Sequence, residues 1–209
     1  MNGTKSRIVF HAPLIKLPKI NYKLAIIFTF FVCGLIIGSA CIAYGSDDIV
    51  NAIDDIFEST RKSRLQSGFL DIIIGSFLTS FLYFLTSFIL GLCAAGIPFI
   101  LLIPAVKGVY LGAVTSIMYS MFGLSGVGYC ALILFPGAAI MLASLFFACS
   151  SGIGMSLELC RIITKKSSPD DYGLLKMYCI RYGVLLLIAL FASVTDAVLL
   201  KAFGSFFSF

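Results

Sequence analysis

The segment from Gly96 to Pro136 restricts the fold more than any other part of the chain. It is almost entirely apolar, yet Pro98, Pro104, Lys107 and several glycines interrupt it. In lipid, every backbone N–H and C=O group needs a partner inside the protein, so helix breaks are tolerated only where neighbouring helices or a cavity supply partners. By helical rise, Lys107 lies roughly 15 Å from either expected break, near the midplane of a bilayer. The pattern predicts the polar, irregular centre of a membrane bundle.

The composition indicates an integral membrane protein. Of the 209 residues, 60% are hydrophobic and 12% are charged, whereas soluble domains are about 45–50% apolar and about 25% charged. The net charge of +5 is not gathered into a basic stripe with interleaved aromatic residues, so we expect no nucleic-acid partner. The seven cysteines form no C-x-x-C pair and are interpreted as small buried hydrophobic residues. We therefore expect neither a metal site nor a cofactor.

Long apolar runs predict an all-α fold, a single bundle over residues 24–205. The expected transmembrane helices are about residues 24–45, 70–92, 98–121, 136–157 and 182–203. The first of them is too long for the apolar core of a signal peptide, so we interpret it as a retained span. Between Gly126 and Pro136 the run is too short to cross, and we prefer a broken or re-entrant half-helix there. One long kinked helix is the competing interpretation.

The distribution of basic residues predicts the orientation. Ten Lys and Arg residues lie in the tail 1–23 and the loop 158–181, and four lie in the loop 46–68 and the C-terminus. Short cytoplasmic loops carry the excess of basic residues. We therefore expect a plasma-membrane protein with a cytoplasmic N-terminus and an extracytoplasmic C-terminus.

The extracytoplasmic loop 46–68 carries apolar residues at helical spacing, among them Ile49, Ile53 and Phe57, with acidic residues opposite. This pattern predicts a short amphipathic helix. Such a helix either rests on the bilayer surface or forms a docking face for another protein.

No catalytic group is expected. Gly123 to Gly126 matches the G-x-S-G pattern of rhomboid-type proteases, but Ser125 needs a base, and the single histidine, His11, lies in the N-terminal tail. Dinucleotide, Walker and zinc-protease motifs are absent from the sequence. We therefore expect that the protein is not an enzyme.

Charges inside apolar runs are the other chemical signal, because they are costly in lipid and usually pair or line a polar pathway. They are Lys107 and Asp196, and less deeply Asp71 and Glu158. An ion pair between Lys107 and Asp196 is expected to join the third and fifth spans. Three roles are open for Lys107: structural pairing or snorkelling, a substrate or ion pathway, and assembly with a partner.

Glycine pairs suggest where helices approach closely. Gly34 and Gly38 form a G-x-x-x-G pair in the first span, and Gly108 and Gly112 form another in the third. Such pairs favour close helix packing in membranes. A partner's membrane helix packed against Gly34 and Gly38 is one expected mode of association, and a homo-oligomer is left open.

The chain resembles the stage II sporulation protein M family over about residues 24–203. The likeness rests on a G-x-P, K-G-x-x-x-G and distal proline pattern: Gly96, Pro98, Lys107, Gly108, Gly112 and Pro136. The resemblance implies a non-enzymatic membrane anchor that recruits two cell-wall hydrolases, the stage II sporulation proteins P and D, during engulfment in endospore formation. The alternative function is a small transporter, or a membrane subunit of one, with Lys107 and Asp196 in its path.

Overall fold

The computed structural model describes residues 22–45, 55, 59–60, 63–64, 67–165 and 171–203. Long helices form nearly all of these residues, and no strand occurs among them, so the all-α prediction is confirmed. In chain order the elements are α1 (Tyr22–Ala43), α3 (Phe69–Gly91), α4 (Ile97–Tyr129), the π-helix η1 (Cys130–Leu134), α5 (Phe135–Lys165) and α6 (Asp171–Phe203).

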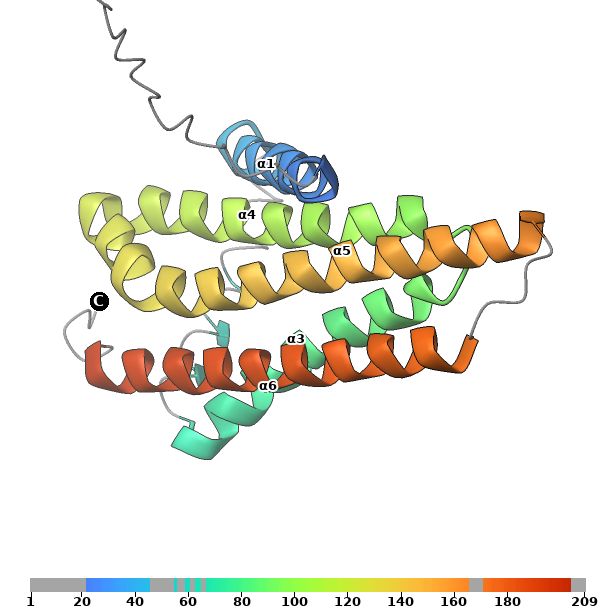
Figure 1. The fold of residues 1–209 in the computed structure, drawn as a ribbon. Helices are drawn as coiled ribbons and strands as arrows, with labels where there is room; N and C mark the ends of the chain where they lie inside the picture. Colours follow the sequence, from blue (N-terminus) through green and yellow to red (C-terminus); the bar gives the residue numbers. More distant parts are fainter. Residues whose placement is uncertain are drawn as a thin grey trace, which may run out of the picture.

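Four apolar helical segments are long enough to cross a membrane. The third, Ile97–Ile162, is 66 residues long and contains α4, η1 and most of α5. Figure 1 shows that this segment turns back on itself, so that α4 and α5 form a hairpin. Large apolar side chains such as Phe28 (56% exposed) and Leu187 (67% exposed) lie on the outside of the bundle, as lipid-facing positions require. The chain is a multi-pass helical membrane protein.

The hairpin corner lies at Gly123, where φ is 56° and ψ is −131°. This conformation is open mainly to glycine, which has no Cβ. After the corner the chain folds back onto α4 so closely that a Cβ at Gly126 would overlap the carbonyl oxygen of Met118. The structure therefore corrects the predicted break at Pro136. The expected third span already ends at about residue 121, close to this corner, and residues 126–135 continue helically into α5, as in the competing interpretation of a kinked helix.

Pro136 is the second residue of α5, and a π turn accommodates it. Proline has no N–H to donate, and its ring crowds the carbonyl four residues earlier. Directly before it, the N–H of Phe135 donates to the carbonyl of Cys130, five residues back, within η1. Such widened turns usually occur as single insertions within α-helices. Pro136 therefore marks a local change of hydrogen bonding within a helix.

Gly96 and Pro98 shape the tight turn between α3 and α4. A Cβ at Gly96 would overlap the carbonyl oxygen of Leu90, so the turn has no room for a side chain. Pro98 lies in the first turn of α4, where its missing N–H costs little because those N–H groups have no intrahelical partner. The hydroxyl of Ser156 on α5 donates to the carbonyl oxygen of Cys93 at 2.7 Å, which ties this turn to the bundle.

The two glycine pairs pack against each other across the α1–α4 interface. Gly34 and Gly38 on α1, and Gly108 and Gly112 on α4, are all buried. A Cβ on any of them would overlap a backbone oxygen of the facing helix. Those oxygens belong to Ala105, Val109, Phe31 and Leu35, respectively. Close backbone contact through small residues is the usual way for membrane helices to associate. Because α4 covers Gly34 and Gly38, the expectation that a partner's helix packs there is corrected.

Hydrogen-bonded aromatic residues join α3, α5 and α6. The hydroxyl of Tyr182 on α6 donates to the carbonyl oxygen of Ala148 at 2.9 Å and lies 3.0 Å from the hydroxyl of Ser87 on α3. Tyr178 stacks on Phe88, with 5.0 Å between ring centroids. These contacts satisfy polar groups that lipid could not, and they hold α6 against the rest of the bundle.

The bundle has two distinct ends. At the first, which we call the corner end, Ile72 near the start of α3 and Leu200 near the end of α6 pack with Tyr129 and Ile133 of the hairpin corner. At the second, the turn end, lie the α3–α4 turn, the end of α5 and the start of α6 (Figure 1).

We expect Gly38→Ala to destabilise the bundle, because the new methyl group would meet the backbone of α4, which cannot rotate away. Overpacking of this kind costs about 1–3 kcal/mol. Gly183→Ala on α6 is the matched control, since a Cβ there has nothing within 4 Å. Thermal unfolding of the two purified variants in the same detergent measures the difference. Equal midpoints would mean that the α1–α4 contact is not tightly packed.

Candidate functional site: a polar cavity near the corner end

A cavity of about 400 Å³ lies between α3, α4, α5 and α6, near the corner end. Its volume falls within the range of small-molecule sites, about 300–1,000 Å³. Most of the polar side chains that line it come from α3 and α4, with two from α6 and three from residues 60–67. The lining includes Thr60, Arg64, Ser67, Asp71, Ser76, Thr79, Ser80, Tyr83, Lys107, Tyr110, Ser193 and Asp196.

Asp196 on α6 is held in an ion pair at one side of this cavity. Its carboxylate accepts a hydrogen bond from the guanidinium of Arg64 at 2.6 Å and another from the hydroxyl of Ser76 at 2.9 Å. The side chain of Asp196 is 18% exposed and that of Arg64 is 37% exposed. A carboxylate in a membrane helix needs such partners, because an unpaired charge there costs several kcal/mol, about 2.5–3.5 on insertion scales.

Lys107 on α4 points into the same cavity between two aromatic rings. Its ammonium lies 4.9 Å from the ring centroid of Tyr83 and 5.3 Å from that of Tyr110. A cation within about 6 Å of an aromatic face is attracted by the ring quadrupole, more strongly when water is excluded. The two tyrosines therefore stabilise the lysine charge without neutralising it.

The structure corrects the expected ion pair between Lys107 and Asp196. Both residues line one cavity, as their depths suggested, but Arg64 is the partner of Asp196. No described carboxylate lies within 4.0 Å of the Lys107 ammonium. Arg64, which comes from outside the apolar runs, is thus the ion-pair partner of Asp196, whereas Lys107 contacts aromatic rings.

The other charges at the edges of apolar runs have local partners. Asp71 accepts a hydrogen bond from the backbone N–H of Gly68 at 3.2 Å, which caps the start of α3. Glu158 accepts one from Arg161 at 3.0 Å, one turn further along α5. Asp71 also lines the cavity, whereas Glu158 belongs to the turn end.

The remaining predicted residues have different positions. Ser125 is exposed at the hairpin corner and does not line the cavity. Among the described residues, no group of three His, Cys, Asp or Glu side chains is placed to hold a metal ion. Ile49, Ile53 and Phe57, the predicted docking face, lie outside the described residues.

Sequence reasoning missed Arg64, Ser76, Tyr83 and Tyr110. A signal for three of them was present, because Ser76, Ser80, Tyr83 and Ser87 recur at helical spacing and Tyr110 lies one turn after Lys107. A polar stripe on an apolar helix, facing a lysine with a tyrosine beside it, indicates a shared cavity. Nothing in the sequence connects Arg64 with Asp196, which is 132 positions away.

We expect Arg64→Gln and Asp196→Asn to be energetically coupled by about 1 kcal/mol, within the range for contacting residues. The measurement is a double-mutant cycle on thermal or denaturant unfolding in detergent. The Glu158→Gln and Arg161→Gln pair is the matched control, because both side chains are largely exposed and such pairs couple by only about 0.2–0.5 kcal/mol. A larger coupling between Lys107→Gln and Asp196→Asn than between Arg64→Gln and Asp196→Asn would contradict the observed pairing.

The comparisons with known proteins place the chain in a family. A comparison with curated proteins and a comparison with solved structures each returned no match. The family described as stage II sporulation protein M matches residues 27–195. This match runs from the first turns of α1 to the residue before Asp196, so it includes the glycine interface, the α3–α4 turn, Lys107 and the hairpin corner. The chain belongs to the stage II sporulation protein M family.

Proposed function

We propose that the protein is a non-enzymatic membrane scaffold that positions cell-wall hydrolases during engulfment in endospore formation. The family match over residues 27–195 is the observation that carries the proposal, because it includes almost the whole bundle. The proposed partners are hydrolases of the stage II sporulation protein P and D type, together with the lipid bilayer.

The packing of the bundle suits a protein that acts by position. Four residues of the family pattern, Gly96, Gly108, Gly112 and Pro98, lie in the tight turn or the α1–α4 contact. They build a rigid frame, since each close backbone approach leaves little room for rearrangement. A scaffold needs such a frame, because its contact surfaces must keep their place relative to the membrane.

The corner end is the proposed contact surface for hydrolases. From the positive-inside rule we expect the turn end in the cytoplasm and the corner end facing the cell wall. Two large side chains beside the hairpin corner are strongly exposed there, Leu124 at 87% and Tyr119 at 62%. Leu124 directly follows the break at Gly123, so it stands on a fixed corner of the chain. Large exposed apolar side chains that lie together at a surface turn are a candidate protein contact.

A photo-crosslinking amino acid in place of Leu124 tests this proposal in intact sporulating cells. We expect crosslinks to a peptidoglycan hydrolase, identified by mass spectrometry. Met177, which is 55% exposed on α6 at the turn end, is the matched control position and should give no hydrolase.

Two outcomes would contradict the scaffold. One is equal hydrolase capture at Leu124 and Met177. The other is capture of no hydrolase at Leu124 or Tyr119, together with unchanged septal localisation of fluorescent hydrolases in a strain that lacks the protein.

The polar cavity supports a second candidate function, a small transporter or a membrane subunit of one. Lys107 there has no carboxylate partner among the described residues, and a cation of this kind attracts anionic solutes. Lys107→Gln separates the two candidates because it removes the charge but keeps most of the side-chain volume. If the protein is a scaffold, Lys107→Gln should leave hydrolase crosslinking at Leu124 within about twofold of wild type, since the substitution does not change the surface around Leu124. A transporter should fold normally and lose solute flux while no hydrolase is captured.

A further inference from the structure

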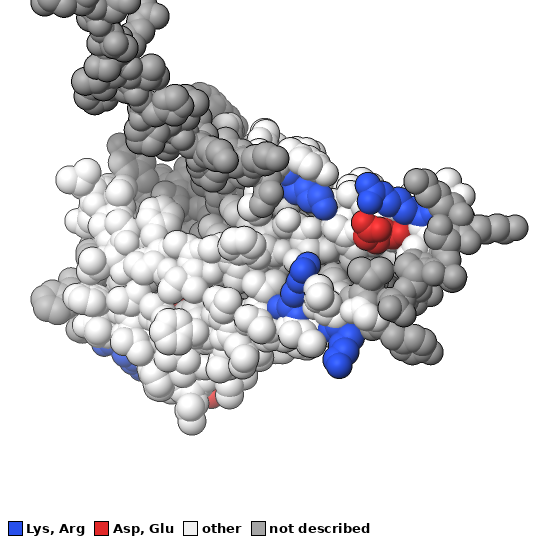
Figure 2. All heavy atoms as spheres, in the orientation of Figure 1, with Lys and Arg blue, Asp and Glu red and all other residues white. Residues whose placement is uncertain are grey.

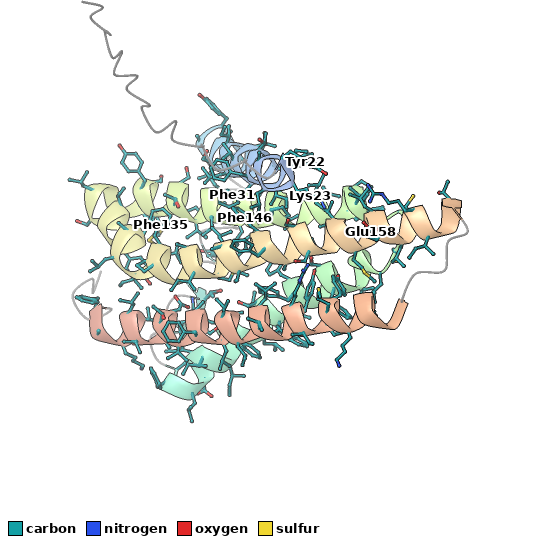
Figure 3. All side chains as sticks on the ribbon, viewed as in Figure 1. Tyr22, Lys23, Phe31, Phe135, Phe146 and Glu158 are labelled. Carbon is teal, nitrogen blue, oxygen red and sulfur yellow. The ribbon has the colours of Figure 1, made fainter. Side chains whose placement is uncertain are left out.

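A second cavity, of about 480 Å³, opens at the turn end, between the start of α1, the last turns of α5 and the first turns of α6. In Figure 3, Tyr22 and Lys23 at the start of α1 lie toward α5, and Glu158 lies further along α5. The polar side chains that line this cavity are Lys23, Ser150, Ser151, Glu158, Arg161 and Arg181, with Tyr22 and Tyr178 beside them. Neither proposed function uses this site.

Positive charge exceeds negative charge in this cavity. Three cationic side chains line it, but Glu158 is the one carboxylate among its lining residues, and Arg161 already binds it at 3.0 Å. The guanidinium of Arg181 donates to the thioether sulfur of Met177 at 3.4 Å, a weak acceptor. No described carboxylate lies within 4.0 Å of Lys23 or Arg181. Two cations that come from different helices therefore face the cavity without a carboxylate partner among the described residues.

Two hydroxyl groups in the same cavity are also available to a ligand. Many serine and threonine side chains in these helices donate to a carbonyl of their own helix, as Thr79 and Thr115 do. Ser150 and Ser151 make no such bond to another described residue. Hydroxyls beside unpaired cations are the donors that bind the oxygens of a phosphate.

The surroundings of the cavity favour a ligand that also has an apolar part. Figure 2 shows basic side chains around an acidic one at the right-hand end of the molecule, next to a broad surface without charge. Phe147 on α5 and Ile180 and Val184 on α6 are each more than half exposed. Met155 and Leu157 contribute apolar lining to the cavity itself. An anionic ligand with an apolar tail would therefore find polar groups for its charged head and an exposed apolar helix surface beside them for its tail.

We infer that this cavity binds the phosphate-bearing headgroup of an anionic phospholipid, with the acyl chains along the exposed face of α5 and α6. Arg181 offers a planar fork for phosphate oxygens and Lys23 a mobile point charge, a combination suited to this group. Basic pockets between membrane helices are known to take acidic headgroups on the cytoplasmic side, where positive-inside counting puts the turn end. The site is independent of hydrolase binding, because its residues lie at the opposite end from Leu124.

Native mass spectrometry of the purified protein with added phosphatidylglycerol or phosphatidylcholine tests the inference. We expect the wild-type protein to retain phosphatidylglycerol in preference to phosphatidylcholine. Lys23→Gln combined with Arg181→Gln should lower phosphatidylglycerol retention roughly 30-fold, since each basic residue near an anionic headgroup contributes roughly five- to sixfold. Lys176→Gln is the matched control for one lost charge, because Lys176 is exposed on the same helix but does not line the cavity.

A second variant blocks the cavity without changing charge. A Cβ at Gly154 would lie 3.6 Å from the Lys23 ammonium. Gly154→Leu therefore fills the part of the cavity next to that ammonium and should also reduce lipid retention. Size-exclusion chromatography checks that each variant is folded. An equal effect of Lys176→Gln, or unchanged retention in folded Gly154→Leu, would overturn the inference. Displacement of the lipid by excess inorganic phosphate would assign the site to free phosphate instead and would also overturn it.

Discussion

The backbone contact between α1 and α4 determines how α4 is rotated, and the polar cavity depends on that rotation. Gly108 and Gly112 must face α1, because only glycine fits against the carbonyl oxygens there. Neighbouring residues on a helix point about 100° apart, so Lys107 cannot share the face of Gly108. It turns toward α3 instead, where Tyr83 receives its ammonium. Gly108 and Gly112 therefore determine the direction in which Lys107 points, although neither glycine contacts its ammonium.

The same demand for backbone partners explains why prolines are tolerated in this bundle. Two of the prolines lie where the missing N–H costs little, Pro98 in a first helical turn and Pro136 directly after a π turn, whereas Pro104 lies inside α4. The α3–α4 turn, which no regular helix protects, receives the hydroxyl of Ser156. In lipid no water would satisfy these groups, so the irregular positions lie where the bundle itself provides partners.

Much of the fold could be predicted from the sequence, because apolar length and glycine spacing are local signals. The long apolar runs indicated the helices, and Gly34 and Gly38 indicated a close contact, although their partner inside the chain was missed. The exact position of the hairpin corner was not predictable from proline alone, since the glycine-rich run after Phe122 offers several break points and, among the described glycines, Gly123 is the one that adopts a positive φ. The depths of Lys107 and Asp196 along their helices indicated that the two lie close together, and both line one cavity. The ion-pair partner of Asp196 could not be predicted, because Arg64 is far from it in the sequence.

The two cavities differ in how they balance charge, and this difference separates their chemistry. Near the corner end, the carboxylate of Asp196 is neutralised by Arg64, and aromatic rings surround the one remaining cation, Lys107. At the turn end, Arg161 neutralises Glu158, but Lys23 and Arg181 line the cavity without a carboxylate partner among the described residues. Aromatic rings partly stabilise a cation held between them, whereas a cation without such partners gains more when an anion binds. The corner-end charges therefore have partners within the bundle, whereas Lys23 and Arg181 at the turn end have no carboxylate partner among the described residues.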